Sequence, residues 1–71
     1  MFERTMHIQL NGKPYALETA TTLADLCAQL DLGNSRYAVE VNYEIIPRSE
    51  HDAYALKADD QVEIVQAIGG G

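Results

Sequence analysis

The sequence predicts an α+β fold in which one helix packs on one face of a mixed β-sheet of four to five strands. Several short segments alternate between apolar and polar residues, which is typical of strands with one buried face. One segment between them has its apolar residues at helical spacing instead. The chain has 71 residues, a length that supports a single hydrophobic core. We therefore expect one domain.

The first two predicted strands form an antiparallel hairpin. Residues 6–10 and 15–18 both alternate, and this alternation directs His7 outward, away from the core. Asn11 and Gly12 lie between the two segments, and this pair tolerates the positive φ angles of a tight turn. The turn therefore fixes the pairing of the two strands.

The predicted helix begins after Thr22. Thr22 and Asp25 resemble a capping box, with Asp in place of the more common Glu. Apolar side chains follow at spacing i, i+3, i+4 and i+7, namely Leu23, Leu26, Cys27 and Leu30. This spacing predicts a helix of about two to three turns with one apolar stripe. Gly33 lies where a residue of left-handed conformation would end the helix.

Three further strands are predicted after the helix. Residues 37–41 alternate and are rich in aromatic and β-branched side chains, whereas residues 44–47 form a shorter run that Pro47 restricts to a sheet edge. Residues 48–60 are predicted to be a polar connection that ends in a turn. The last predicted strand covers residues 61–65.

The order strand, strand, helix, strand, short strand, strand is that of the β-grasp, or ubiquitin-like, fold. Residues 1–66 are expected to form this domain, and residues 67–71 a flexible tail that ends in three glycines. Glycine raises the entropy cost of order and offers no side chain for packing. The glycines therefore indicate either a frayed terminus or a thin tail that enters a narrow site in another protein.

Composition excludes several classes of function. Eleven acidic and five basic residues give a net charge of -6, which repels nucleic acids and anionic membrane surfaces. No segment approaches the ~20 apolar residues that span a bilayer. One cysteine, without clustered histidines, offers neither a disulfide nor a metal site. These features favour a cytoplasmic protein with no nucleic-acid, membrane or metal partner.

The reactive side chains do not suggest an enzyme. Cys27 falls on the apolar stripe of the predicted helix, where a buried thiol is expected. His7 and His51 are predicted to be solvated, His51 because it lies in the polar connection. No residue order indicates a nucleophile beside a base, and no glycine-rich loop lies between a strand and a helix to hold phosphates. We expect no catalytic residue and no bound cofactor.

The last strand indicates a docking patch. If Val62 and Ile64 face the core, Val65 must lie on the opposite, solvent-facing side. Ile68 then leads into the glycines with nothing to cover it. We therefore predict that Val65, Ala67 and Ile68 bind partners beside the tail.

Two segments resemble the ThiS family, the sulfur carriers of thiamine biosynthesis. Residues 41–49 resemble the segment that links the third strand of these proteins to the short edge strand, and residues 65–71 resemble their closing stretch. The resemblance covers residues 6–71. It does not cover residues 1–5, which are an extension, an upstream start or a cloning remnant. The functional diglycine of the family maps onto Gly70 and Gly71, leaving Gly69 as a spacer.

The resemblance implies a chemistry that needs no catalytic side chain from this protein. A ubiquitin-activating-type adenylyltransferase uses ATP to convert the Gly71 carboxylate into an acyl adenylate. Sulfur from a persulfide donor displaces AMP and leaves a C-terminal thiocarboxylate. Thiazole synthase accepts the sulfur and builds the thiazole ring of thiamine. Gly70 and Gly71 would enter the channel of the partner enzyme.

Three alternatives stay open on the sequence. The small subunit of molybdopterin synthase shares the fold, the diglycine and the thiocarboxylate, and a ubiquitin-like modifier would be conjugated through Gly71 to lysines. A β-grasp binding module would make no use of its glycines. Arg48 and Tyr43, within the family-like segment, are each either partner contacts or ordinary surface residues.

Overall fold

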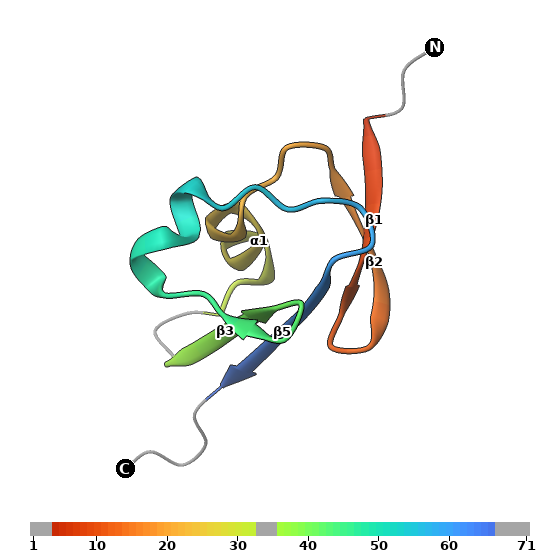
Figure 1. Ribbon diagram of the computed structural model, residues 1–71. Coiled ribbons are helices and arrows are strands. Elements are labelled where there is room, and N and C mark those ends of the chain that lie inside the picture. Colours follow the sequence, from red (N-terminus) through yellow and green to blue (C-terminus); the bar gives the residue numbers. More distant parts are fainter. Residues whose placement is uncertain (1–3, 33–35, 67–71) are drawn as a thin grey trace.

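The computed structural model describes residues 4–32 and 36–66 and shows five strands, one main helix and a short 3₁₀ helix (Figure 1). In chain order the elements are β1 (Thr5–Leu10), β2 (Lys13–Glu18), α1 (Leu23–Leu30), β3 (Tyr37–Val41), β4 (Glu44–Ile45), the 3₁₀ helix η1 (Arg48–Ala53) and β5 (Gln61–Gln66). The predicted α+β class and its β-grasp element order are confirmed.

The five strands form one mixed sheet in the order β2-β1-β5-β3-β4. Strand β5 pairs with β3 in antiparallel fashion and with β1 in parallel fashion. The parallel pairing is short, with Gln9 opposite Gln61 and Leu10 opposite Val62. Strand β5, the last of the described strands, therefore lies at the centre of the sheet, between its two hairpins.

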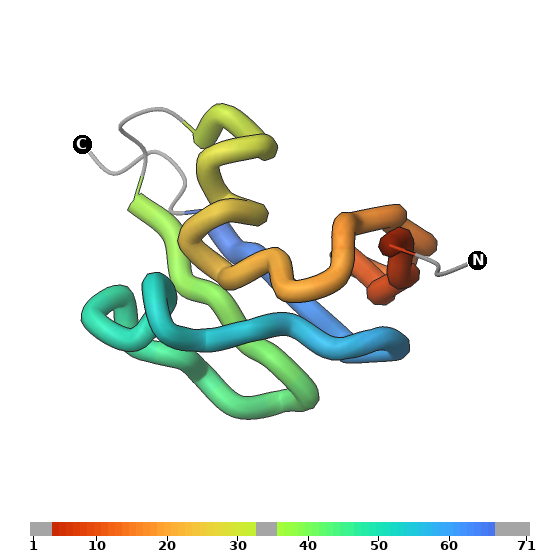
Figure 2. Tube along the Cα trace, turned by 90° about the horizontal axis from the view of Figure 1, so that it is seen from above, coloured from red at the N-terminus to blue at the C-terminus, as the bar shows by residue number. Residues whose placement is uncertain are grey.

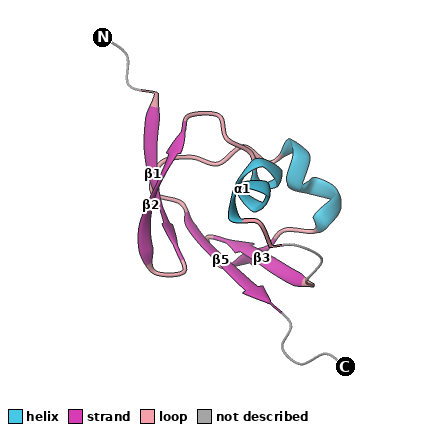
Figure 3. Ribbon diagram, turned by 180° about the vertical axis from the view of Figure 1, so that it is seen from behind, coloured by secondary structure: helices cyan, strands magenta, loops and turns pink. Residues whose placement is uncertain are grey.

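The hydrophobic core lies between α1 and the inner face of the sheet. Figure 2 shows α1 lying over this face, and Figure 3 shows α1 and η1 on the same side of the strands. The largest fully buried side chains are Ile8, Leu23, Leu26, Val39, Val41 and Val62. Full burial of such a side chain stabilises the fold by about 1.5–3 kcal/mol. The face of the sheet away from α1 is here called the open face.

Side chains cap the N-terminal end of α1, whereas a backbone hydrogen bond from the N–H of Asp31 to the carbonyl oxygen of Ala28 closes its C-terminal end. The backbone N–H of Asp25 donates to Thr22 Oγ1 at 3.1 Å, and the N–H of Thr22 donates to Asp25 Oδ2 at 3.3 Å, which confirms the capping box. The left-handed residue at the C-terminal end is Asp31, with φ 53°. Asp tolerates this conformation through local hydrogen bonding, so the left-handed stop comes two residues before Gly33, which lies outside the described residues.

The first hairpin has the predicted turn and a longer pairing than predicted. Asn11 and Gly12 take φ angles of 51° and 82°, as the turn requires. Strand β1 begins at Thr5, which pairs with β2, and the carbonyl of Arg4 accepts a hydrogen bond from the N–H of Thr19 at 2.7 Å. Residues 4 and 5 therefore take part in the hairpin.

The segment from residue 48 to residue 60, predicted to be a polar connection that ends in a turn, has more regular structure and more burial than its polarity indicates. It contains the 3₁₀ helix η1, which packs on α1, and Leu56, which is only 3% exposed. His51 is also buried rather than solvated. Its Nε2 donates to the carbonyl oxygen of Ile46 at 2.9 Å. Because η1 packs on α1, His51 is buried even though its neighbours in the sequence are polar.

Candidate docking surface beside the C-terminal strand

Alternate side chains of β5 point to the two faces of the sheet. Val62 is 1% exposed and Ile64 packs against the core, whereas Val65 on the open face is 58% exposed. The predicted orientation of these three residues is confirmed. Val65 lies directly opposite Ala38 of β3, one residue before β5 ends at Gln66. An apolar side chain thus stands in solvent two residues before the predicted tail.

The buried carboxylate of Asp60 fixes the start of β5. Asp60 Oδ2 accepts a hydrogen bond from the N–H of Lys57 at 2.8 Å, and Asp60 Oδ1 accepts one from Asn42 Nδ2 at 3.1 Å. Asn42 Oδ1 in turn accepts from the N–H of Gln61 at 3.0 Å. These bonds tie the β3–β4 turn to β5 and fix a register in which a one-residue slip would bury Val65.

Two further large apolar side chains are exposed on the same half of the molecule. Ile45 is 68% exposed and Tyr43 is 77% exposed. Ile45 pairs with Glu40 of β3, and Glu40 lies two residues from Ala38, so Ile45 and Val65 share the open face. We did not predict Ile45 as a contact residue. Strand alternation was the available signal, because burial of the next isoleucine turns Ile45 outward.

Tyr43 is held outward by a strained turn. Asn42 and Tyr43 both have positive φ angles, 52° and 72°. Asn adopts such angles readily, whereas they are unusual for a bulky residue such as Tyr. The two side-chain hydrogen bonds of Asn42 hold the turn in place. The side chain of Tyr43 therefore projects from the tip of the β3–β4 hairpin.

Two grooves flank the end of β5. Strand β1 pairs with β5 only as far as Val62, so the following residues of β5 border a groove of about 680 Å³ beside the turn of the first hairpin. Within it the N–H of Ile64 donates to Asn11 Oδ1 at 2.8 Å. A smaller groove of about 250 Å³ lies on the β3 side, and its lining residues are Arg36, Tyr37, Ala38, Val65 and Gln66.

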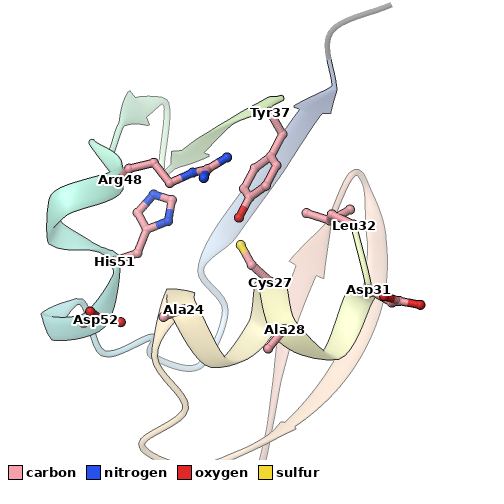
Figure 4. Close-up of a pocket in the computed structure, with 9 residues that line it drawn as sticks. All are labelled: Ala24, Cys27, Ala28, Asp31, Leu32, Tyr37, Arg48, His51 and Asp52. Atoms are coloured by element: carbon pink, nitrogen blue, oxygen red, sulfur yellow. The ribbon is translucent and has the colours of Figure 1, made fainter. Parts of the chain in front are cut away.

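A third hollow, of about 440 Å³, lies on the helix side between α1, β3 and η1 (Figure 4). The Cys27 thiol points toward the Tyr37 hydroxyl, and the Arg48 guanidinium lies 4.1 Å from the centre of the Tyr37 ring. Burial raises the pKa of the Tyr37 hydroxyl, and Cys27 raises it further, while Arg48 acts in the opposite direction. The hydroxyl is therefore protonated at neutral pH. Cys27 is buried as predicted, and Arg48 packs on an aromatic ring.

Of the residues predicted to meet partners, only Val65 lies in the described part of the chain. Ala67, Ile68, Gly69, Gly70 and Gly71 lie outside it. Among residues 4–32 and 36–66, no group of three His, Cys, Asp or Glu side chains is placed to hold a metal ion. The same residues contain no helix with the length and apolar character needed to cross a membrane.

The sheet order, the single helix and the exposed end of the central strand define a small ubiquitin-like β-grasp protein. A sequence model of the ThiS family matches residues 8–71. The chain therefore belongs to the ThiS family, the sulfur carrier proteins of thiamine biosynthesis, as the resemblance in residues 41–49 and 65–71 led us to expect. Members of this family are carriers and not enzymes.

Known relatives agree in sequence and in structure. The sulfur carrier protein ThiS of Bacillus subtilis is 40% identical over 65 residues, which cover 90% of this chain and 98% of that protein. The crystal structure of ThiS from Geobacter metallireducens aligns with a TM-score of 0.78 at 32% identity, covering 93% of this chain and all of that one. A thiazole synthase of Magnetococcus marinus is 42% identical over 66 residues, and this chain spans 20% of its length.

Proposed function

We propose that this protein carries sulfur on the carboxylate of Gly71. The observation that supports the proposal most directly is that the match to the ThiS family extends through residue 71 and so includes the glycine tail. The chain contributes a docking surface and a substrate carboxylate, and it leaves the catalysis to its partners. The tail supplies the reacting group, and the β-grasp domain supplies the surface that the partner enzymes bind.

The proposed chemistry proceeds in two stages. A ubiquitin-activating-type adenylyltransferase binds the chain and ATP, the Gly71 carboxylate attacks the α-phosphate, and pyrophosphate leaves. A persulfide sulfur of the donor then attacks the acyl adenylate and displaces AMP. Cleavage of the resulting sulfur–sulfur bond by a thiol leaves the thiocarboxylate on Gly71. ATP belongs to the partner in this scheme, and the carrier holds no cofactor of its own.

The proposed acceptor of the sulfur is thiazole synthase. The proposed location of this transfer is the cytoplasm. Support comes from the Magnetococcus marinus thiazole synthase, which contains a segment similar to nearly the whole of this chain. A carrier domain and the synthase within one polypeptide are kept at high effective concentration. We infer that the same pairing of carrier and thiazole synthase operates for this protein.

The experiment that tests this function is an intact-mass measurement. The purified protein is incubated with the adenylyltransferase of the same organism, ATP and a persulfide donor, and we expect one terminal oxygen to be replaced by sulfur. A matched variant with a permanent tag after Gly71 presents an amide in place of the carboxylate and should gain no sulfur. Sulfur uptake by the tagged variant at the normal rate would refute the carrier function.

Substitutions in the tail should separate reactivity from folding. We expect Gly70→Ala and Gly71→Ala to slow adenylation or sulfur transfer, because each added methyl group narrows the fit in the channel of the partner. Gly69→Ala should have a mild effect, since only the last two glycines match the family diglycine. Single-turnover rates of adenylation measure the first effect, and melting temperatures that stay unchanged serve as the control for folding.

A further inference from the structure

The two halves of the open face differ in character. On the β1–β2 half the outward residues are small or polar, namely Thr5, His7, Gln9, Pro14, Ala16 and Glu18. On the β3–β4–β5 half apolar and acidic side chains accompany one amide, and the outward residues are Ala38, Glu40, Ile45, Gln61, Glu63 and Val65. All the large apolar side chains that are exposed in the described part of the chain lie in β4, in β5 or in the turn before β4.

At the centre of the second half, two carboxylates face each other across a strand pair. Glu40 of β3 lies directly opposite Glu63 of β5 in the antiparallel register. Like charges at such positions destabilise a sheet, because the two side chains start only about 5 Å apart. Within the described residues neither carboxylate forms an ion pair. In this part of the chain two adjacent carboxylates therefore lie without an ion-pair partner, between Ile45 on one side and Val65 on the other.

We propose that this half of the open face is a docking surface for a protein that inserts an arginine between Glu40 and Glu63. A guanidinium group carries five donors in a planar fork, so it can bond to both carboxylates at once, whereas an ammonium group acts as a point charge. Apolar side chains of the same partner would cover Ile45 and Val65 and exclude water from the ion pairs. Such a dry rim around a central charged contact is typical of strong interface positions.

The surface charge selects this occupant over a second copy of the chain. Each copy carries a net charge of -6, and a symmetric contact through this face would bring carboxylate against carboxylate. Nucleic acid is repelled in the same way. The position along the chain also matters, because Val65 lies at the end of β5, where the tail begins. A partner bound to this surface therefore contacts Val65, two residues before the predicted tail.

This inference rests on the proposed function, which supplies the partner, namely the adenylyltransferase. Its test is the affinity of that enzyme for the wild-type chain and for Glu40→Gln and Glu63→Gln, measured by calorimetry at about 0.1 M and about 1 M salt. The matched control is Glu18→Gln, which removes one charge from the same face at the opposite edge of the sheet. Melting temperatures are recorded for every variant.

At low salt we expect Glu40→Gln and Glu63→Gln each to weaken binding about tenfold, while their melting temperatures stay unchanged or rise because the repulsion is relieved. Glu18→Gln should bind as the wild type does. At about 1 M salt the Debye length falls from ~10 Å to ~3 Å, so the difference between the variants should narrow. A loss of the expected size confined to Glu40 and Glu63 supports the surface.

Equal affinities for all four proteins would overturn the surface, and so would an equal loss in the Glu18→Gln control, which would reflect net charge alone. If the wild type still acquires the thiocarboxylate in such a case, the carrier function stands and only this inference fails. If the wild type neither binds the enzyme nor acquires sulfur, the carrier function fails and the inference fails with it.

Discussion

The two faces of the C-terminal half of the sheet are built from the same three strands and differ in almost every property. On the inner face Val39, Val41 and Val62 are each 1% exposed and pack beneath α1. On the open face Glu63 and Val65, which alternate with these positions, stand in solvent. Along β3 and β5, residues that stabilise the core therefore alternate with residues that are exposed and available for binding. A single substitution should affect one property and spare the other.

The strongest challenge to this separation is a charge placed on the inner face. Val62→Asp would bury a carboxylate with no partner, at a cost of several kcal/mol. Because a domain of this size is expected to have only ~3–5 kcal/mol of stability, we expect the variant to be unfolded at room temperature. Circular dichroism measures this outcome. A folded Val62→Asp protein would show that the inner face is not the dominant source of stability.

A smaller loss of stability is expected from a substitution of His51, a buried residue of η1. His51→Leu leaves the carbonyl of Ile46 without its donor, which costs about 2 kcal/mol. For a domain of this size each kcal/mol lowers the melting temperature by roughly 4–8 °C. The matched control is His7→Leu, since His7 is exposed on the open face. Equal melting temperatures for the two variants would contradict the structural role of His51.

On the open face the expected effect moves from stability to binding. Val65→Asp should change the free energy of unfolding by less than about 0.5 kcal/mol, as at other surface positions. If Val65 is an important contact, binding to the adenylyltransferase should weaken by about 2 kcal/mol. Thermal unfolding and calorimetry on one preparation compare the two quantities. Unfolding of the variant, or undiminished affinity, would contradict the division between the faces.

The smallest expected effect is confined to alkaline solution. Burial, then Cys27, raises the pKa of Tyr37 above 10.0, and Arg48 partly offsets this. The folded state therefore favours the neutral hydroxyl, and this contribution to stability is complete below pH 10 and is lost as pH rises through the folded-state pKa. We expect Tyr37→Phe to lose less stability than the wild type between neutral pH and pH values above 10. Denaturant unfolding at both pH values measures the difference, and equal losses would contradict the shift.

Much of the fold could be predicted from local signals. The capping box at Thr22 and the apolar stripe of α1 specify the helix, and the Asn11–Gly12 pair specifies the first turn. Strand alternation also placed Val65 correctly, because one side of β5 must be buried. These features depend on neighbours within a few residues. The sequence alone therefore contains what is needed to recognise them.

Features set by distant parts of the chain were missed. Burial of His51 and Leu56 depends on η1 and the following segment folding back over α1, and their polar neighbours in sequence give no sign of it. The register that brings Glu40 opposite Glu63 joins strands separated by the whole of β4 and η1. The docking surface was predicted only where it follows from alternation within one strand.

The central position of β5 in the sheet has a consequence for how the chain folds. The first hairpin alone is marginal in water, and an isolated helix of eight residues is too short to persist. Both halves of the sheet pair with β5, which follows all the other described strands along the chain. A nascent or truncated chain that lacks β5 thus stays unfolded and open to proteolysis. Under the proposed function, a partner enzyme that recognises the assembled sheet would therefore bind only chains in which β5 is present and paired.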